Sequence, residues 1–395
     1  MHKFLASILL TVSTSLSLGL QASLFDQDAP LKVEIQADFL LLETERKKEN
    51  KYPGVLTIDQ HQLPIELTVR GNNRLRRDTC RFSPLKVDFK KSPARKQTVF
   101  HKEGDLKLVV LCKKNSSYYD YLRTEYLAYK MLNALTPLSY RVRWVDVTYK
   151  TADKTLKERP AFFVEHKKRV AKRNGKGLDQ PAKLPRYSNL DPHQTALLEQ
   201  FQYFVGNTDY SLLRSPDPGE CCHNAKLLSG ENHYAPIIYD FDASGLVNTS
   251  YSAPPPQFKI STVLTRLFRG HCQEQTALQG AREQILGAKE EIWRWLPQIL
   301  NYPEAALEGR FDIPKRHLLI SRRTKPGQKI SSTPVERFSA RFSMGRPTMI
   351  DSNSATIATA FISDNKTPVG YNQSLGLWMT TFIELKLAQE FSRPG

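Results

Sequence analysis

The chain has 395 residues, of which 40% are hydrophobic and 25% charged, an ordinary globular composition with room for a large core and two lobes or domains. The formal net charge of +17 favours anionic partners such as nucleotide phosphates, nucleic acid or acidic envelope polymers, and a solvated basic surface would also explain it. Beyond the N-terminus no segment approaches the ~20 apolar residues of a spanning helix, which excludes further membrane spans of that kind.

The N-terminus has the pattern of a secretory signal peptide. Lys3 precedes a run of apolar and small residues, and Ala22 is a small residue suited to cleavage. The sequence therefore predicts a signal peptide over residues 1–22. We expect an exported protein, secreted or periplasmic, with no transmembrane anchor after cleavage.

The next part of the chain alternates apolar and polar residues in the manner of strands, with Pro and Gly between the runs. Strands are expected at residues 31–43, 54–59, 63–70, 84–89, 106–112, 140–149 and 159–166. One helix interrupts them at 116–135, where tyrosines and leucines recur at helical spacing and Pro137 ends the pattern.

The remaining chain has a different character. A basic, turn-rich segment, 167–190, is expected to link two lobes, and a helix follows over 191–206, with Asp191 as its cap. Two short strands, 225–228 and 236–241, precede helices at 259–270 and 276–300. From residue 320 the chain is rich in Ser, Thr and Pro without a sustained period, which predicts an atypical or poorly ordered tail over 320–395.

Two-lobed protein kinases are built in this order of elements, and by that analogy we expect an α+β, two-lobed, protein-kinase-like fold. An antiparallel sheet with one helix would form the N-terminal lobe, and a mostly helical lobe would follow. The expected divisions are a signal peptide (1–22), a β-rich lobe (23–166), a basic linker (167–190), a helical lobe with the metal-site loop (191–319) and the tail (320–395).

The five cysteines suit disulfide bonds in an exported protein. Cys80 and Cys112 flank strand-like runs and are expected to pair. Cys221 or Cys222 could pair with Cys272, which would leave one thiol over. A zinc site is the less favoured alternative, because the vicinal pair lacks the C-x-x-C spacing.

Residues with carboxylate or carboxamide side chains gather at the ends of apolar elements between positions 207 and 242. Asn207 and Asp209 follow a helix, Asn224 precedes a strand, and Asp240 and Asp242 end the next strand. Mg²⁺ takes carboxylate and carboxamide oxygens and keeps several waters, so one or two carboxylates and an Asn suffice. Phosphoryl transfer needs such ligands, a cation on the donor phosphates and an acidic residue facing the acceptor.

The stretch "GNTDY…CCHNAKLL…YAPIIYDFDASGLV" resembles the spore-coat CotH kinase family, and "NTD…HN…YDFD" is similar to the catalytic half of HipA-type proteins. The resemblance extends upstream through "RGNN", "LKLVVLCK" and "FFVEH" and covers roughly residues 60 to 270. It implies a phosphotransferase that uses ATP and Mg²⁺, with a protein or another hydroxyl as acceptor.

The resemblance also implies a role for each matching residue. Asp209 would be the base, supported by Asn207, and Asn224, Asp240 and Asp242 would hold the metal. The nucleotide-binding residues would be Lys107, oriented by Glu125, together with Arg70 and Gly71 in a covering turn and Glu165 near the adenine, and Lys86 competes with Lys107.

Other interpretations of these residues stay open. Asp209 and Asp240 could bond backbone amides in turns, and Lys107 and Glu125 could contact solvent. Arg74, with the arginines that follow it, is expected in a solvated basic turn. The alternative function is a catalytically inactive pseudokinase that binds anionic envelope polymers or a partner protein. Nucleic acid is not expected as a partner, because no helix combines a basic stripe with a docking motif.

Overall fold

The computed structural model describes residues 22–271 and 273–300. The predictions for the tail from residue 320, for Cys272 and for all but the last residue of the signal peptide lie outside these residues. Within them, no helix is long and apolar enough to cross a membrane.

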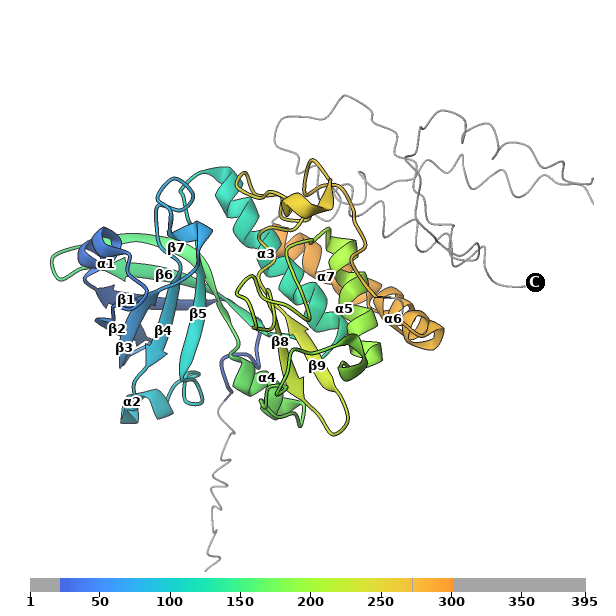
Figure 1. Cartoon of the computed structure of the whole chain (residues 1–395). Helices are drawn as coiled ribbons and strands as arrows, with labels where there is room; N and C mark the ends of the chain where they lie inside the picture. Colours follow the sequence, from blue (N-terminus) through green and yellow to red (C-terminus); the bar gives the residue numbers. More distant parts are fainter. Residues whose placement is uncertain (1–21, 272, 301–395) are drawn as a thin grey trace, which may run out of the picture.

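Seven strands form a closed barrel, on the left in Figure 1. They are β1 (Leu31–Ala37), β2 (Tyr52–Ile58), β3 (His61–Val69), β4 (Leu85–Phe89), β5 (Asp105–Val110), β6 (Val142–Lys150) and β7 (Thr155–Val164). The order around the barrel is β1-β2-β3-β4-β5-β7-β6. Neighbouring strands are antiparallel except at the closure, where β1 and β6 run parallel with Val33 opposite Val147.

The chain also forms helices and a second sheet of two strands, and their order along the chain agrees in part with the predicted order. The helices are α1 (Phe39–Glu45), α2 (Pro93–Lys96), α3 (Ser116–Leu135), α4 (Lys167–Arg173), α5 (Pro192–Val205), α6 (Gln275–Gly287) and α7 (Lys289–Leu300), with short 3₁₀ turns η1 (Asn73–Leu75), η2 (Tyr187–Asn189) and η3 (Pro256–Phe258). Strands β8 (Ala225–Ser229) and β9 (Tyr234–Ile238) form an antiparallel hairpin.

Two hydrophobic cores divide the molecule. The first fills the barrel and includes Leu106, Leu108 and Val110 of β5. The second surrounds α3 and includes Val109 of the same strand. Since successive strand residues point to opposite faces, β5 contributes to both cores. Lys107 therefore lies on the outer face of the barrel, which is the face turned toward α3 and the hairpin.

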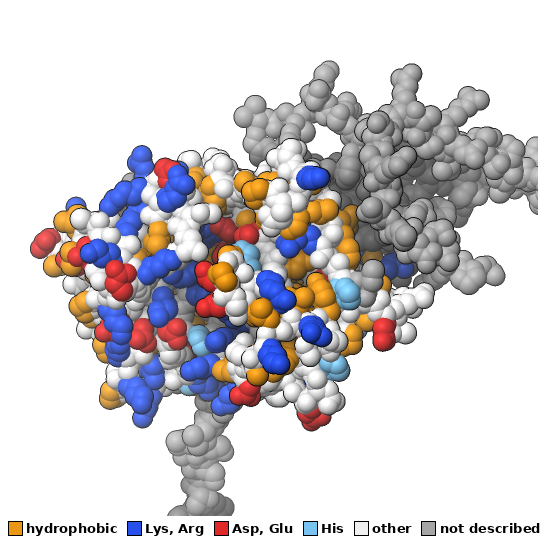
Figure 2. Space-filling view, in the orientation of Figure 1, with side chains coloured by type: hydrophobic (Ala, Val, Ile, Leu, Met, Phe, Trp, Pro, Cys, Tyr) orange, Lys and Arg blue, Asp and Glu red, His pale blue; other side chains and the backbone are white. Residues whose placement is uncertain are grey.

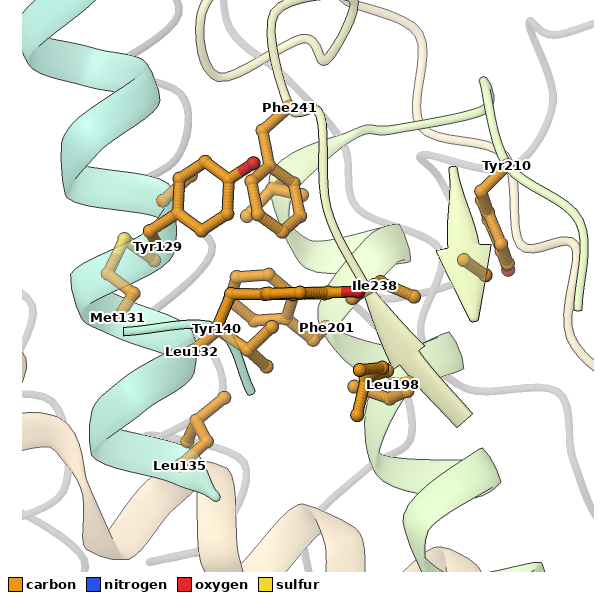
Figure 3. Close-up of a cluster of buried hydrophobic side chains, with 14 of the residues drawn as sticks. Tyr129, Met131, Leu132, Leu135, Tyr140, Leu198, Phe201, Tyr210, Ile238 and Phe241 are labelled. Atoms are coloured by element: carbon orange, nitrogen blue, oxygen red, sulfur yellow. The ribbon is translucent and has the colours of Figure 1, made fainter. Parts of the chain in front are cut away.

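Figure 3 shows how α3 is held in the second core. Tyr129, Leu132 and Leu135 of α3 point toward side chains of α5 and of the hairpin segment, with the Tyr129 ring 4.8 Å from that of Phe241 in an edge-on contact. Helix α3 also contacts α7. The long helix therefore belongs to the core that it shares with the later helices.

These findings correct the predicted fold class. The prediction of a two-lobed, protein-kinase-like fold with an N-terminal antiparallel sheet and a mostly helical C-terminal lobe is wrong, because the seven strands close into a barrel. Alternation specifies a strand and its buried face but not its partner. The closure depends on β1 meeting β6, more than one hundred residues later in the chain.

Two local predictions also need correction. The strand expected over 31–43 ends at Ala37, because the Asp38 carboxylate accepts a hydrogen bond from the Leu41 N–H and begins α1. The helix expected over 259–270 is absent, and that segment forms turns and irregular backbone. Its β-branched Ile, Thr and Val residues are weak helix formers.

One predicted disulfide is confirmed and another pairing is different. Cys80 and Cys112 are bonded, with Cα atoms 4.5 Å apart, and they join the loop after β3 to the end of β5. Cys221 is bonded to its neighbour Cys222, a pairing that the sequence did not suggest. The bond between Cys80 and Cys112 is compatible with an extracellular protein.

Candidate functional site

The open end of the β8–β9 hairpin brings Asn224 and Asp240 together. Ala225 pairs with Ile238, and the Tyr239 N–H donates to the Asn224 carbonyl at 3.0 Å, so Asp240 lies one residue beyond that bond. Both residues have left-handed backbone, with φ of 49° at Asn224 and 68° at Asp240. Such conformations are uncommon for residues other than glycine and are concentrated at functional sites.

The loop after α5 places Asp209 beside this end of the hairpin. Helix α5 ends at Gly206, which has φ of 66°, and Asn207 then accepts a hydrogen bond from the Asp209 N–H at 2.9 Å. The Asn224 amide donates to the Asp209 carbonyl at 2.7 Å and to its Oδ2 at 3.1 Å. Asn207 thus shapes the turn, and Asp209 and Asn224 are joined directly.

His223 forms the other contact of Asp209. Its Nε2 lies 2.8 Å from Asp209 Oδ1, and paired backbone hydrogen bonds between His223 and Ser211 hold the two segments side by side. The hydrogen bond with Asp209, which outweighs burial, raises the pKa of His223. Asp209 and His223 are therefore a hydrogen-bonded pair at the edge of the site.

The Asp240 carboxylate is the least satisfied of these groups. Within the described residues, no N–H or O–H group donates a hydrogen bond to it, although its backbone N–H donates to Tyr129 Oη at 2.9 Å. Burial opposes ionisation, but the positive charges of Arg74, Arg70, Lys107 and His223 lower its pKa overall. Asp240 is therefore an anion held by surrounding charges, with its oxygens left for a ligand.

Lys107 stands opposite the hairpin. Its Nζ lies 3.8 Å from the centre of the Tyr239 ring, a cation–π contact. Burial, together with the charge of Arg70, lowers the pKa of Lys107 to about 7, while Asp240 acts in the other direction. Within the described residues, Lys107 has no carboxylate within the 4.0 Å of an ion pair.

Glu125 and Asp242 are held by Arg74, which the sequence had suggested would be solvated. Arg74 Nη2 lies 2.7 Å from Glu125 Oε2 and 2.8 Å from Asp242 Oδ2. Tyr251 Oη donates to the same Asp242 oxygen at 3.1 Å. Burial raises the pKa of both carboxyl groups, and Arg74 opposes that shift. The implied pairing of Glu125 with Lys107 is therefore replaced by one with Arg74.

The remaining candidate residues occupy different surroundings. Arg70 lies at the end of β3, where its charge acts on Lys107 and Asp240, and Gly71 forms the next turn with φ of 96°. Glu165 is buried and paired with Arg173 at 3.0 Å, so its carboxylate already has a partner. Lys86 is opposite Lys107 in register and reaches Asp105 at 4.0 Å.

The structure thus gathers Arg70, Lys107, Asp209, Asn224 and Asp240, and places the Arg74 cluster next to them. Figure 2 shows acidic, basic and histidine side chains close together near the middle of this face, between the barrel and the helices. Sequence reasoning missed Arg74 as a buried residue and Tyr239 as a lysine contact. The "RGNNRLRR" turn offered several arginines, and no local pattern distinguishes the buried one.

The donor set fits Mg²⁺ better than a metal that requires an all-protein shell. No group of three His, Cys, Asp or Glu side chains within the described ranges could hold a metal ion. The Asp240 carboxylate and the Asn224 carboxamide oxygen are free of protein partners there, and Mg²⁺ needs only a few protein oxygens besides water and phosphate. Asp242 fits less well, because Arg74 and Tyr251 hold one of its oxygens.

Comparisons with known proteins add no family to this description. No protein-family model matches the chain, and no curated protein matches it. The resemblance to CotH-like proteins rests on the motifs quoted above.

Proposed function

We propose that this protein is an exported, Mg²⁺-dependent phosphotransferase that moves a phosphoryl group from ATP to a hydroxyl of a protein or another acceptor. The observation that carries the proposal is the Asp240 carboxylate, which accepts no hydrogen bond from the described residues and lies near the bonded pair of Asp209 and Asn224 and near the charges of Lys107 and Arg70. The motif resemblance to CotH-like enzymes supports the activity, although the fold it implied is not retained.

Each residue has a role that follows from its surroundings. Asp240 and the Asn224 carboxamide oxygen would hold Mg²⁺, which when bound neutralises charge on the donor phosphates. Lys107 and Arg70 would bind phosphate oxygens, and contact with a phosphate raises the pKa of Lys107 so that it is fully charged in the complex.

Asp209 would act on the acceptor. The acceptor oxygen attacks the terminal phosphorus as the bond from that phosphorus to the leaving phosphate oxygen breaks, and the hydroxyl proton passes to Asp209. His223 holds the Asp209 carboxylate by its 2.8 Å contact. Asn224 fixes the other oxygen of Asp209 and thereby links the base to the metal site.

Export is proposed from the N-terminal pattern and supported by the disulfide of Cys80 with Cys112. Fractionation of cells that express the full chain would test it. The proposal requires the processed protein outside the cytoplasm, and recovery of only unprocessed chain in the cytoplasm would contradict it.

Asp240→Asn tests the activity because it removes the charge and keeps the shape. The wild type should show a thermal shift with Mg²⁺ and ATP together that exceeds the shift with either alone, and D240N should lose that excess. Asp153→Asn, in the exposed turn between β6 and β7, is the matched control and should behave as wild type. A wild-type protein without any metal-dependent shift would contradict the proposal.

Arg74 favours a second candidate function. Because its guanidinium holds Glu125 and Asp242, two of the expected acidic residues are already neutralised by the protein itself. A catalytically inactive module that binds anionic envelope polymers would tolerate this arrangement. Salt-sensitive polymer binding that survives both Asp209→Asn and Asp240→Asn, without phosphoryl transfer, would favour this function.

A further inference from the structure

Four cationic side chains beside the site have no acidic partner. They are Arg70, Lys107, Lys167 and Lys226, which we call the cationic strip. Within the described part of the chain none of the four forms an ion pair within 4.0 Å or a side-chain hydrogen bond, and the contact of Lys107 is with a tyrosine ring. By contrast, Lys130 is paired with Asp28 at 2.6 Å and Lys150 with Glu34 at 2.5 Å.

The topology explains why these four lie together. Lys107 of β5 is opposite Val164 of β7, and α4 begins three residues later at Lys167. Lys226 lies two residues after Asn224 on β8, on the same face of the hairpin as Tyr239, whose ring carries the Lys107 ammonium. A bridge between Gly177 and Ser229 fastens the chain after α4 to the end of β8. The strip therefore extends from Lys107 toward the start of α4 and toward β8.

The strip is costly without a ligand. All four residues are only partly exposed. Partly buried cations that lie together without carboxylate partners are a feature of binding sites, because an anion would offset the cost of their burial.

We propose that the cationic strip binds a run of linked phosphate groups, with Lys167 and Lys226 holding phosphates beyond those held by Lys107 and Arg70. The inference rests on the proposed function in that Lys107 belongs to both sites, but the strip requires no metal. Adjacent phosphates offer closely spaced charges with several acceptor oxygens each, which matches four cations drawn from four separate elements. A nucleoside triphosphate and inorganic polyphosphate share this chemistry.

Calorimetric titration of the full chain with inorganic tripolyphosphate, in the presence of a chelator, tests the strip. We expect Lys167→Gln and Lys226→Gln each to weaken binding about tenfold, the loss of one charged contact, and the double variant to weaken it further. Lys32→Gln is the matched control. Lys32 is exposed on β1, which pairs with β6 where the barrel closes and contributes no residue to the strip.

The outcomes separate the strip from the catalytic proposal. Equal tripolyphosphate affinity in the wild type and the double variant would overturn the strip, as would equal binding of polyglutamate, a carboxylate polymer. Binding of ATP without binding of tripolyphosphate would also overturn it. Tighter binding of longer inorganic chains than of ATP would support the strip with inorganic polyphosphate as the source, and the reverse order would support it with a nucleotide. Metal-free tripolyphosphate binding without any Mg²⁺-dependent effect would sustain the strip and reject the phosphotransferase.

Discussion

Replacement of Arg74 by Met should destabilise the protein in a pH-dependent manner. Arg74 is the cation between Glu125 and Asp242, and its side chain is 11% exposed while that of Glu125 is 3% exposed. Removal of one partner from a buried ion pair costs about 3–5 kcal/mol, because the other charge is left without compensation. Two carboxylates lose their partner here, although Tyr251 still donates to Asp242. We therefore expect a loss of about 4 kcal/mol in the free energy of unfolding at pH 7.5.

The same variant should be less affected at pH 5. Burial already raises the pKa of Glu125 and Asp242, and Arg74 is the strongest influence that opposes that shift. An acid whose pKa is higher in the folded state makes folding more favourable at low pH and less favourable as pH rises through the folded pKa. The difference between R74M and wild type should therefore shrink between pH 7.5 and pH 5.

Urea unfolding at both pH values measures these differences. Arg76→Met is the matched control, since Arg76 is 69% exposed and paired with the similarly exposed Asp78, and it should unfold at the wild-type urea concentration. An R74M protein that loses less than about 1 kcal/mol at pH 7.5, or loses the same amount at both pH values, would show that the Arg74 pairing does not stabilise the fold as argued.

The wild type should become more stable as pH rises from 7 to 9, because the pKa of Lys107 is lowered to about 7 in the folded protein and is ordinary when unfolded. In Lys107→Met, the charged neighbours Arg70, Asp240 and Lys226 remain, and the free energy of unfolding measured in urea should rise less between pH 7 and pH 9. An equal rise in the variant and the wild type would contradict a buried Lys107 with a lowered pKa. Replacement of Cys80 and Cys112 by Ser should cost about 4 kcal/mol, because the bond closes a loop with a sequence separation of 32. Equal unfolding free energies of oxidised wild type and the double variant would show that the bond does not constrain the unfolded chain.

Local pattern predicted the parts of this structure that local chemistry decides. Alternation identified the strands and the buried face of β5, which leaves Lys107 on the opposite face. A hairpin brings its two ends together, which explains why Asn224 and Asp240 lie close. The contact of Asp209 with Asn224 depends instead on the loop after α5.

Long-range pairing decided the rest. The parallel contact of β1 with β6 leaves no signal in either segment, so the closed barrel was missed. Arg74 was expected to be solvated with its neighbours, and burial of one arginine among several depends on two carboxylates from distant elements, Glu125 and Asp242. The functional roles of the gathered residues remain proposals that the experiments above test.

The parallel closure of the barrel has a consequence for the order of folding. Strand β1 can pair with β2, which is close in sequence, early in folding. Its second neighbour, β6, is available only after most of the barrel sequence has been synthesised. Contacts at such separation slow folding, because chain entropy is lost before they form. Ser23 and Leu24, just before β1, are buried in the finished structure. If a leader is removed after Ala22, the protease must therefore act on a chain whose barrel is still open.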